Sequence, residues 1–196
     1  MGSDTGPVSV PEVLMRAVVL LRGVNVGGVR FAMADLRVAL EQAAFTDVRT
    51  VLASGNVLLT SGGGDRRAIA GRVHEVIHDR FGFDVAAIAV SLAVIRSAVE
   101  GYPFTRTADR HAYVVFAGDA VALADLVDLA GGIDSAEEQV RPGEDVVYWD
   151  VPKGRTLDSP FGTRFGRWQR SGAVTTRNIR TLEKILAAAA TSTGSV

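Results

Sequence analysis

The feature that most constrains this fold is the order of apolar segments with two different periods between residues 15 and 92. Short apolar runs suited to strands lie at residues 18–21, 48–53, 57–60 and 85–90. Two stretches with helical spacing separate them, one at 33–45 and one that Asp65 can cap and Gly82 can end. The order βαββαβ predicts a ferredoxin-like unit.

This topology places two separate loops at the same end of the sheet. In a ferredoxin-like unit the first two strands run parallel, and the third strand lies between them. The loop after the first strand therefore opens beside the hairpin between the second and third strands. We expect the glycine loop at residues 23–28 to be a spatial neighbour of the hairpin at residues 54–56.

The second half of the chain repeats a similar rhythm. A helical stretch at 91–100 leads to a strand at 112–116, a helix at 121–129 and a hairpin from 137–141 and 146–151. Two helices follow, at 160–170 and 178–190. We predict an α+β fold of two tandem ferredoxin-like units: residues 15–92, and a degenerate unit at 93–192 with C-terminal helices. Residues 1–14, rich in Gly, Ser and Pro, are expected to form a flexible extension.

Composition limits the classes of protein that this chain can represent. Its 196 residues are 47% hydrophobic with a net charge of −1, which fits a soluble core and disfavours a nucleic-acid coat. The absence of cysteine excludes a disulfide framework and thiolate chemistry, and fits the reducing cytoplasm. No apolar run approaches the roughly 20 residues of a membrane span, so we expect no membrane association.

The glycine loop carries the first candidate binding site. Residues 23–30 read GVNVGGVR, close to a phosphate-binding loop, but Val29 takes the lysine position and Arg30 the hydroxyl position. Backbone N–H groups at the helix entrance, with Arg22 and Asn25 beside them, could still form an anion nest. Ordinary turn chemistry at Gly27-Gly28 is an equal alternative.

Two further segments extend this candidate site. The hairpin residues 54–56 are expected beside the loop, although a positive φ alone explains Gly55-Asn56 and favours a structural role for Asn56. Residues 175–178 precede the last helix, where capping is the favoured role and anion binding the alternative. The complete set of candidate ligand-binding residues is Arg22, Gly23, Asn25, Gly27, Gly28, Ser54, Gly55, Asn56, Thr176, Arg177 and Asn178.

A literal HExxH sequence suggests an alternative, zinc-dependent hydrolase function. His74, Glu75 and His78 have the spacing that a zinc site and its general base require. The expected core face of this helix instead contains four apolar residues: Ile69, Val73, Val76 and Ile77. His78 should point away from that face with His74 on its flank, so coincidence on a solvated helix is favoured and no metal or other cofactor is predicted.

A basic segment suggests a second alternative, nucleic-acid or protein interaction. Residues 153–184 contain eight basic residues, whereas residues 119–150 contain nine acidic ones. The aromatic side chains of Phe165 and Trp168 have core spacing, which argues against base stacking. We therefore favour an internal match between the acidic and basic segments and consider nucleic acid an unlikely partner.

Four sequence blocks carry a resemblance to a known family. LLRGVNVGG, MADLR, SGN and TTRNIRTLEKI resemble the bacterial family catalogued as domain of unknown function 1697, over residues 15 to 190. This resemblance implies a compact α+β chain with ferredoxin-like units and implies no reaction. We expect a cytoplasmic protein that binds a small anionic or nucleotide-like ligand at the glycine loop, with catalysis and oligomeric state left open.

Overall fold

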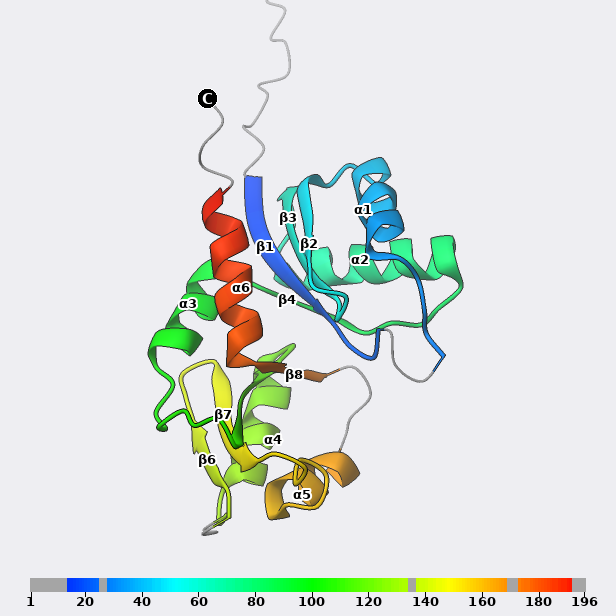
Figure 1. The fold of residues 1–196 in the computed structure, drawn as a ribbon. Coiled ribbons are helices and arrows are strands. Elements are labelled where there is room, and N and C mark those ends of the chain that lie inside the picture. The colour runs from blue at the N-terminus through cyan, green and yellow to red at the C-terminus, as the bar shows by residue number, and fades with distance from the viewer. Residues whose placement is uncertain (1–13, 25–27, 134–136, 169–172, 192–196) are drawn as a thin grey trace, which may run out of the picture.

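The computed structural model describes residues 14–24, 28–133, 137–168 and 173–191 (Figure 1). These residues form two four-stranded antiparallel sheets and six helices. The described helices include none that is both long and apolar enough to cross a membrane.

The first sheet has the predicted ferredoxin-like topology. Its elements are β1 (Leu14–Leu21), α1 (Met33–Gln42), β2 (Thr46–Val51), β3 (Asn56–Gly62), α2 (Arg66–Phe81) and β4 (Ala87–Val90). The strand order is β2-β3-β1-β4, with every neighbouring pair antiparallel. The expected βαββαβ order is therefore confirmed, and both helices cover one face of this sheet (Figure 1).

Local signals account for the ends of these helices. The Asp65 carboxylate accepts a hydrogen bond from the Ala68 N–H at 2.8 Å, and Gly82 ends α2 with a φ of 72°. α1 stops at Gln42, three residues before its expected end, because Ala44 adopts a φ of 65°. Phe45 then returns to the core, where it is buried.

The second sheet contains one strand more than the sequence analysis expected. Its elements are β5 (Arg110–Ala117), α4 (Ala120–Ala130), β6 (Gln139–Pro142), β7 (Val146–Pro152), α5 (Pro160–Trp168) and β8 (Val174–Asn178), and α6 (Ile179–Ala190) follows them. The order β6-β7-β5-β8 repeats that of the first sheet. The second unit, expected to be degenerate, therefore has the complete βαββαβ topology.

The strand β8 escaped sequence-based prediction because its composition is polar. Its sequence VTTRN has no apolar alternation, yet Val174, Thr175 and Arg177 are all buried. Arg177 is accommodated by hydrogen bonds to the first unit, and Thr175 Oγ1 accepts from Arg177; a period-2 hydrophobic pattern reveals neither.

The two sheets share a core built around α3 (Leu92–Glu100) and α6. This cluster combines Val18 and Leu20 of β1 with Val114 and Phe116 of β5, and Ile185 of α6 lies fully buried among them. α3 and α6 lie side by side and cover the face of the first sheet opposite α1 and α2 (Figure 1). The two units therefore meet through a shared apolar core. The helices that follow each unit, α3 and α6, also contribute to this core.

Candidate functional site

The glycine loop and the β2–β3 hairpin are neighbours, as the topology predicted. The Leu21 N–H donates to the Gly55 carbonyl of the hairpin at 2.8 Å. On the other side of β1, the Arg22 N–H donates at 2.9 Å to the carbonyl of Ala86, the residue before β4. Gly23 and Gly28 both have positive φ, of 73° and 104°. The candidate residues Asn25 and Gly27 lie outside the described residues.

Arg177 of β8 reaches from the second unit into this hairpin. Its Nε donates to Asn56 Oδ1 at 2.6 Å, and its Nη2 donates to the Leu21 carbonyl at 2.6 Å and the Gly55 carbonyl at 3.3 Å. Its Nη1 donates to Thr175 Oγ1 at 2.8 Å and to the Thr176 carbonyl at 2.9 Å. The guanidinium therefore ties β8 to the ends of β1 and β3.

The partners of Arg177 in this network are neutral oxygens. Burial lowers the pKa of the Arg177 guanidinium to about 10, so the group still carries its charge at neutral pH. The side chain is only 8% exposed. Its hydrogen bonds thus satisfy the donors of a buried cation without a carboxylate among these five contacts.

Asn56 has a structural role, but not for the reason that its sequence suggested. The residue begins β3 and has no positive φ; the positive-φ residues of this hairpin are Leu52 and Gly55. Its fully buried amide accepts from Arg177 and donates to the Val51 carbonyl at 2.9 Å and to Ser54 Oγ at 3.1 Å. Asn56 therefore joins the turn to β8.

Gly55 is required by this packing. A Cβ atom added at Gly55 would lie 2.8 Å from Leu21 Cβ, and the residue has a φ of 77°. Both the close approach and the backbone conformation exclude a side chain at this position. The SGN motif thus has a local explanation in the packing of the hairpin against β1.

A hollow with several charged side chains in its lining lies beside this network at the end of β1. The loop hollow, as we call it, has a volume of about 830 Å³, and its lining includes Arg22, Gly23, Arg67, His74 and Asp84. Arg22 and Gly23 come from the glycine loop, whereas Arg67 and His74 come from α2. The hollow therefore brings side chains with positive or titratable charge from two elements to the predicted site.

The orientation of His74 follows from its contacts. Its Nδ1 lies 3.0 Å from the Val85 carbonyl oxygen, which can only accept, so Nδ1 carries the proton. Its Nε2 lies 3.5 Å from Asp84 Oδ1 and can accept a hydrogen bond in the neutral form or donate one when protonated. The imidazole is thereby fixed at the edge of the loop hollow.

The HExxH helix presents the faces that the sequence predicted. Ile69, Val73 and Ile77 are buried, whereas Glu75 and His78 are exposed. The rings of His74 and His78 stack with centroids 6.4 Å apart. Among the described residues no group of three metal-ligating side chains is assembled.

The last helix begins as expected. Asn178 is the N-cap of α6, and its Oδ1 accepts a hydrogen bond from the Arg180 N–H at 3.0 Å. Thr176 lies in β8 and contributes its carbonyl oxygen to Arg177. The predicted capping role is confirmed for Asn178.

The basic C-terminal segment is only partly matched by the acidic segment. Arg155 pairs with Glu137 at 3.1 Å, as that interpretation required. The buried Glu138, however, accepts from the Trp149 indole N–H at 2.8 Å and from the Phe161 N–H at 2.6 Å. This carboxylate therefore holds the start of α5 rather than a basic side chain.

The aromatic residues of α5 belong to the core, as their spacing predicted. The rings of Phe161 and Phe165 stack with centroids 5.5 Å apart, and Trp168 packs against Phe165. All three contribute to the apolar cluster of the second unit. They are consequently occupied by packing, which weakens the case for base stacking.

Sequence reasoning missed Arg67 as a candidate. One signal was available: α2 begins with Arg66 and Arg67, and its first turn contains no acidic residue. Positive charge at a helix N-terminus interacts unfavourably with the helix macrodipole. Two adjacent arginines at this position therefore suggest a role other than stabilising the helix. Arg67 lines the same hollow as Arg22 only because α2 packs against the sheet, which the local sequence does not reveal.

The fold and the hollow together define a class: an α+β protein with two ferredoxin-like units and a hollow at a glycine loop. The chain belongs to the family described as protein of unknown function (DUF1697), whose family model matches residues 14–148. This agrees with the family resemblance of its sequence blocks.

A solved structure has the same fold. The conserved bacterial protein SP0830 from Streptococcus pneumoniae is similar with a TM-score of 0.73 and 19% identity, covering 90% of this chain and 99% of that chain. An unknown protein from Galdieria sulphuraria gives a TM-score of only 0.26 at 16% identity, over 84% of this chain and 97% of that chain. The comparison with curated proteins gives no match.

Proposed function

We propose that this protein binds a small anionic ligand in the loop hollow through Arg22, Arg67 and His74. The observation that carries this proposal is the convergence of these three side chains on one hollow beside Gly23. Its volume of about 830 Å³ lies in the range of small-molecule sites. Among the described residues that line it, Asp84 alone is acidic.

Electrostatics favours an anion over a neutral ligand at this position. A hydrogen bond between an ionised donor and an anion contributes roughly 1.5 to 3 kcal/mol, about twice a neutral one. The buried charge of Arg177 lies at the neighbouring hairpin and adds to the positive potential. In this proposal Arg22 contacts the ligand. The residues that stabilise the backbone beside the site are Ser54, Gly55, Asn56 and Arg177.

A thermal-shift screen of phosphate, sulfate, nucleotides and sugar phosphates tests this proposal. A stabilising anion should bind at least about tenfold more weakly to Arg22→Ala and Arg67→Ala, because each loses one charge-assisted contact. Arg96→Ala is the matched control, since Arg96 is exposed on α3 and does not line the hollow. The absence of any stabilising anion, or an unchanged response in Arg22→Ala, would refute the assignment.

The same preparation distinguishes the zinc alternative. Elemental analysis giving one zinc per chain, with a hydrolytic activity lost in Glu75→Gln, would favour a metallohydrolase instead.

We propose a cytoplasmic location for the anion-binding protein, supported by its complete lack of cysteine.

A further inference from the structure

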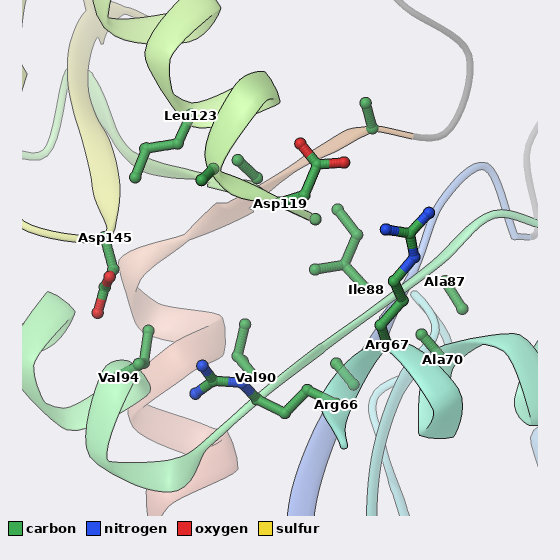
Figure 2. A pocket seen from close by; sticks show the side chains of 15 residues that line it. Arg66, Arg67, Ala70, Ala87, Ile88, Val90, Val94, Asp119, Leu123 and Asp145 are labelled. Atoms are coloured by element: carbon green, nitrogen blue, oxygen red, sulfur yellow. The ribbon is translucent and has the colours of Figure 1, made fainter. Parts of the chain in front are cut away.

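A second hollow continues the first along the edge of the first sheet. This inter-unit cleft, of about 450 Å³, is lined by β4, the start of α2 and the start of α4 (Figure 2). Arg67, Ala70, Ala87 and Ala173 line both hollows. The two hollows therefore adjoin, and a ligand held at Arg22 lies next to the cleft.

The cleft exposes an unpaired strand edge. β4 is the outer strand of its sheet and pairs only with β1 among the described strands. In an antiparallel pair, every second residue of a strand directs its N–H and C=O groups toward the partner strand. The Ala86 carbonyl accepts from the Arg22 N–H, so Ile88 and Val90, two and four residues further on, also direct these groups toward β1.

The alternate residues of β4 face the cleft. The N–H and C=O groups of Ala87 and Ala89 must point away from β1, and no hydrogen-bond partner for them exists within the described part of the chain. Both residues line the cleft. Each of them thus presents one donor and one acceptor, side by side, to whatever occupies it.

The opposite wall supplies carboxylate oxygens. Asp119 lies across the cleft from Arg67 (Figure 2). Its Oδ1 caps α4 by accepting from the Ala122 N–H at 2.8 Å, which leaves Oδ2 as an acceptor. A carboxylate oxygen at this position suits the hydroxyl groups of a sugar.

We infer that the ligand is an aminopurine nucleotide, an inference that rests on the proposed anion site. The phosphate lies in the loop hollow at Arg22 and Arg67, and the sugar hydroxyls donate to Asp119. The base lies against β4, where its amino group donates to a backbone carbonyl and its ring nitrogen accepts from a backbone N–H. An adenine edge carries this donor and acceptor side by side, as one outward-facing strand residue requires.

A small molecule fits this cleft better than an added peptide strand. The free edge spans only Ala87 and Ala89, whereas strand addition relies on a longer row of main-chain hydrogen bonds. The second unit also lies close to the strand: a Cβ atom added at Gly118 would be 3.7 Å from Ile88 Cγ1, an ordinary van der Waals contact.

Calorimetric titration of the full-length protein tests the inference. We expect adenosine monophosphate to bind at least about tenfold more tightly than ribose phosphate, which lacks the base, and than purine riboside monophosphate, which keeps the ring nitrogens but lacks the amino donor. Ala87→Pro removes one outward N–H and leaves the pairing with β1 intact, so it should abolish this advantage while ribose phosphate binds as before. Arg96→Ala should change neither affinity.

A second variant keeps the test independent of proline in the strand. Asp119→Asn retains a good N-cap for α4 but removes the carboxylate. It should abolish the preference for adenosine monophosphate over its deoxyribose analogue. Equal affinities for adenosine monophosphate, purine riboside monophosphate and ribose phosphate, all weakened by Arg22→Ala, would overturn the nucleotide inference and leave anion binding standing. If neither these phosphates nor any anion of the thermal-shift screen binds, both proposals are wrong.

Discussion

Arg177 illustrates how a charged residue can act as an internal connector between two units. Its guanidinium lies among oxygens contributed by β1, the β2–β3 hairpin and β8. Arginine suits this position because its planar fork offers five donors in fixed directions. Lysine could not satisfy oxygens spread over three strands with one ammonium group.

Truncation of Arg177 should strongly destabilise the protein. Arg177→Ala leaves the Leu21 carbonyl and Asn56 Oδ1 without the donor that they share, at roughly 1 to 3 kcal/mol for each buried group. We expect the free energy of unfolding in urea to fall by roughly 2 to 5 kcal/mol. Arg96→Ala, at an exposed site, should change it by no more than about 0.5 kcal/mol. Equal stabilities of the two variants would contradict the role assigned to Arg177.

Tyr102 provides a prediction about alkaline pH. Its hydroxyl donates to Asp150 Oδ2 at 3.0 Å, and Arg110 binds the same buried carboxylate. Burial and the Asp150 charge raise the pKa of the Tyr102 phenol far above its ordinary value, and burial also raises the pKa of Tyr148. Both phenols therefore keep their protons in the folded state at pH values where free tyrosine ionises.

Stability should consequently fall as the pH rises above about 10. In that range the unfolded chain binds fewer protons at these two phenols than the folded chain does, so their ionisation favours unfolding. The lowered pKa of Arg177, a single group, opposes this effect in part. Ultraviolet absorbance should detect ionisation of Tyr102 and Tyr148 only together with unfolding, which circular dichroism follows in parallel. Tyr102→Phe should reduce the alkaline loss of stability. Ionisation of all three tyrosines in a fully folded protein would contradict this prediction.

At the scale of an element, α6 serves both units. Leu182 and Ile185 lie fully buried in the cluster that contains residues of both sheets. At the other end of the helix, Arg16 of β1 donates from Nη2 to the Ala189 carbonyl at 3.0 Å. The helix that follows the second unit is thus anchored on the first.

Ile185→Ala should weaken both units at once. The substitution removes three buried carbon atoms and leaves a cavity, which costs roughly 2 to 5 kcal/mol. Chemical denaturation should give one transition, shifted to lower denaturant, with the same midpoint by circular dichroism and by the fluorescence of Trp149 and Trp168, which both lie in the second unit. Lys184→Ala, at the adjacent exposed position, should leave the midpoint nearly unchanged. Separate transitions for the two probes would argue against a shared core.

At the scale of the whole molecule, the two units depend on each other for burial. The face of the first sheet formed by Val18, Leu20 and Leu58 is covered by helices that lie later in the chain. A unit that ended after β4 would present this face to water. Burial of apolar area is the dominant favourable contribution to folding, so its loss should be decisive.

A fragment of residues 14–91 should therefore fail to fold as a stable monomer. We expect it to bind a hydrophobic dye, to lack a cooperative thermal transition and to aggregate, while the full-length chain does none of these. Calorimetry and dye fluorescence on both proteins give the comparison. A monomeric fragment with a sharp transition would show that each unit is an independent domain.

The first unit was largely predictable because its elements carry local signals. The periods of the apolar residues identify its strands and helices, and Asp65 and Gly82 mark the ends of α2. The adjacency of the glycine loop and the SGN hairpin also followed, because it depends only on strand order. β8 was not predictable, since its buried Arg177 is stabilised by partners in the other unit and its buried Thr175 by Arg177.

Sequence alone thus determined the fold class, the family and the end of the sheet where the glycine loop lies. Only the tertiary structure decided that Arg177 connects the two units and that Arg67 and His74 line the same hollow as Arg22. The reason is the distance along the chain: Arg177 is 121 positions from Asn56 and 156 from Leu21. Local patterns specify strands and helices, whereas such contacts exist only once both units have packed around α3 and α6.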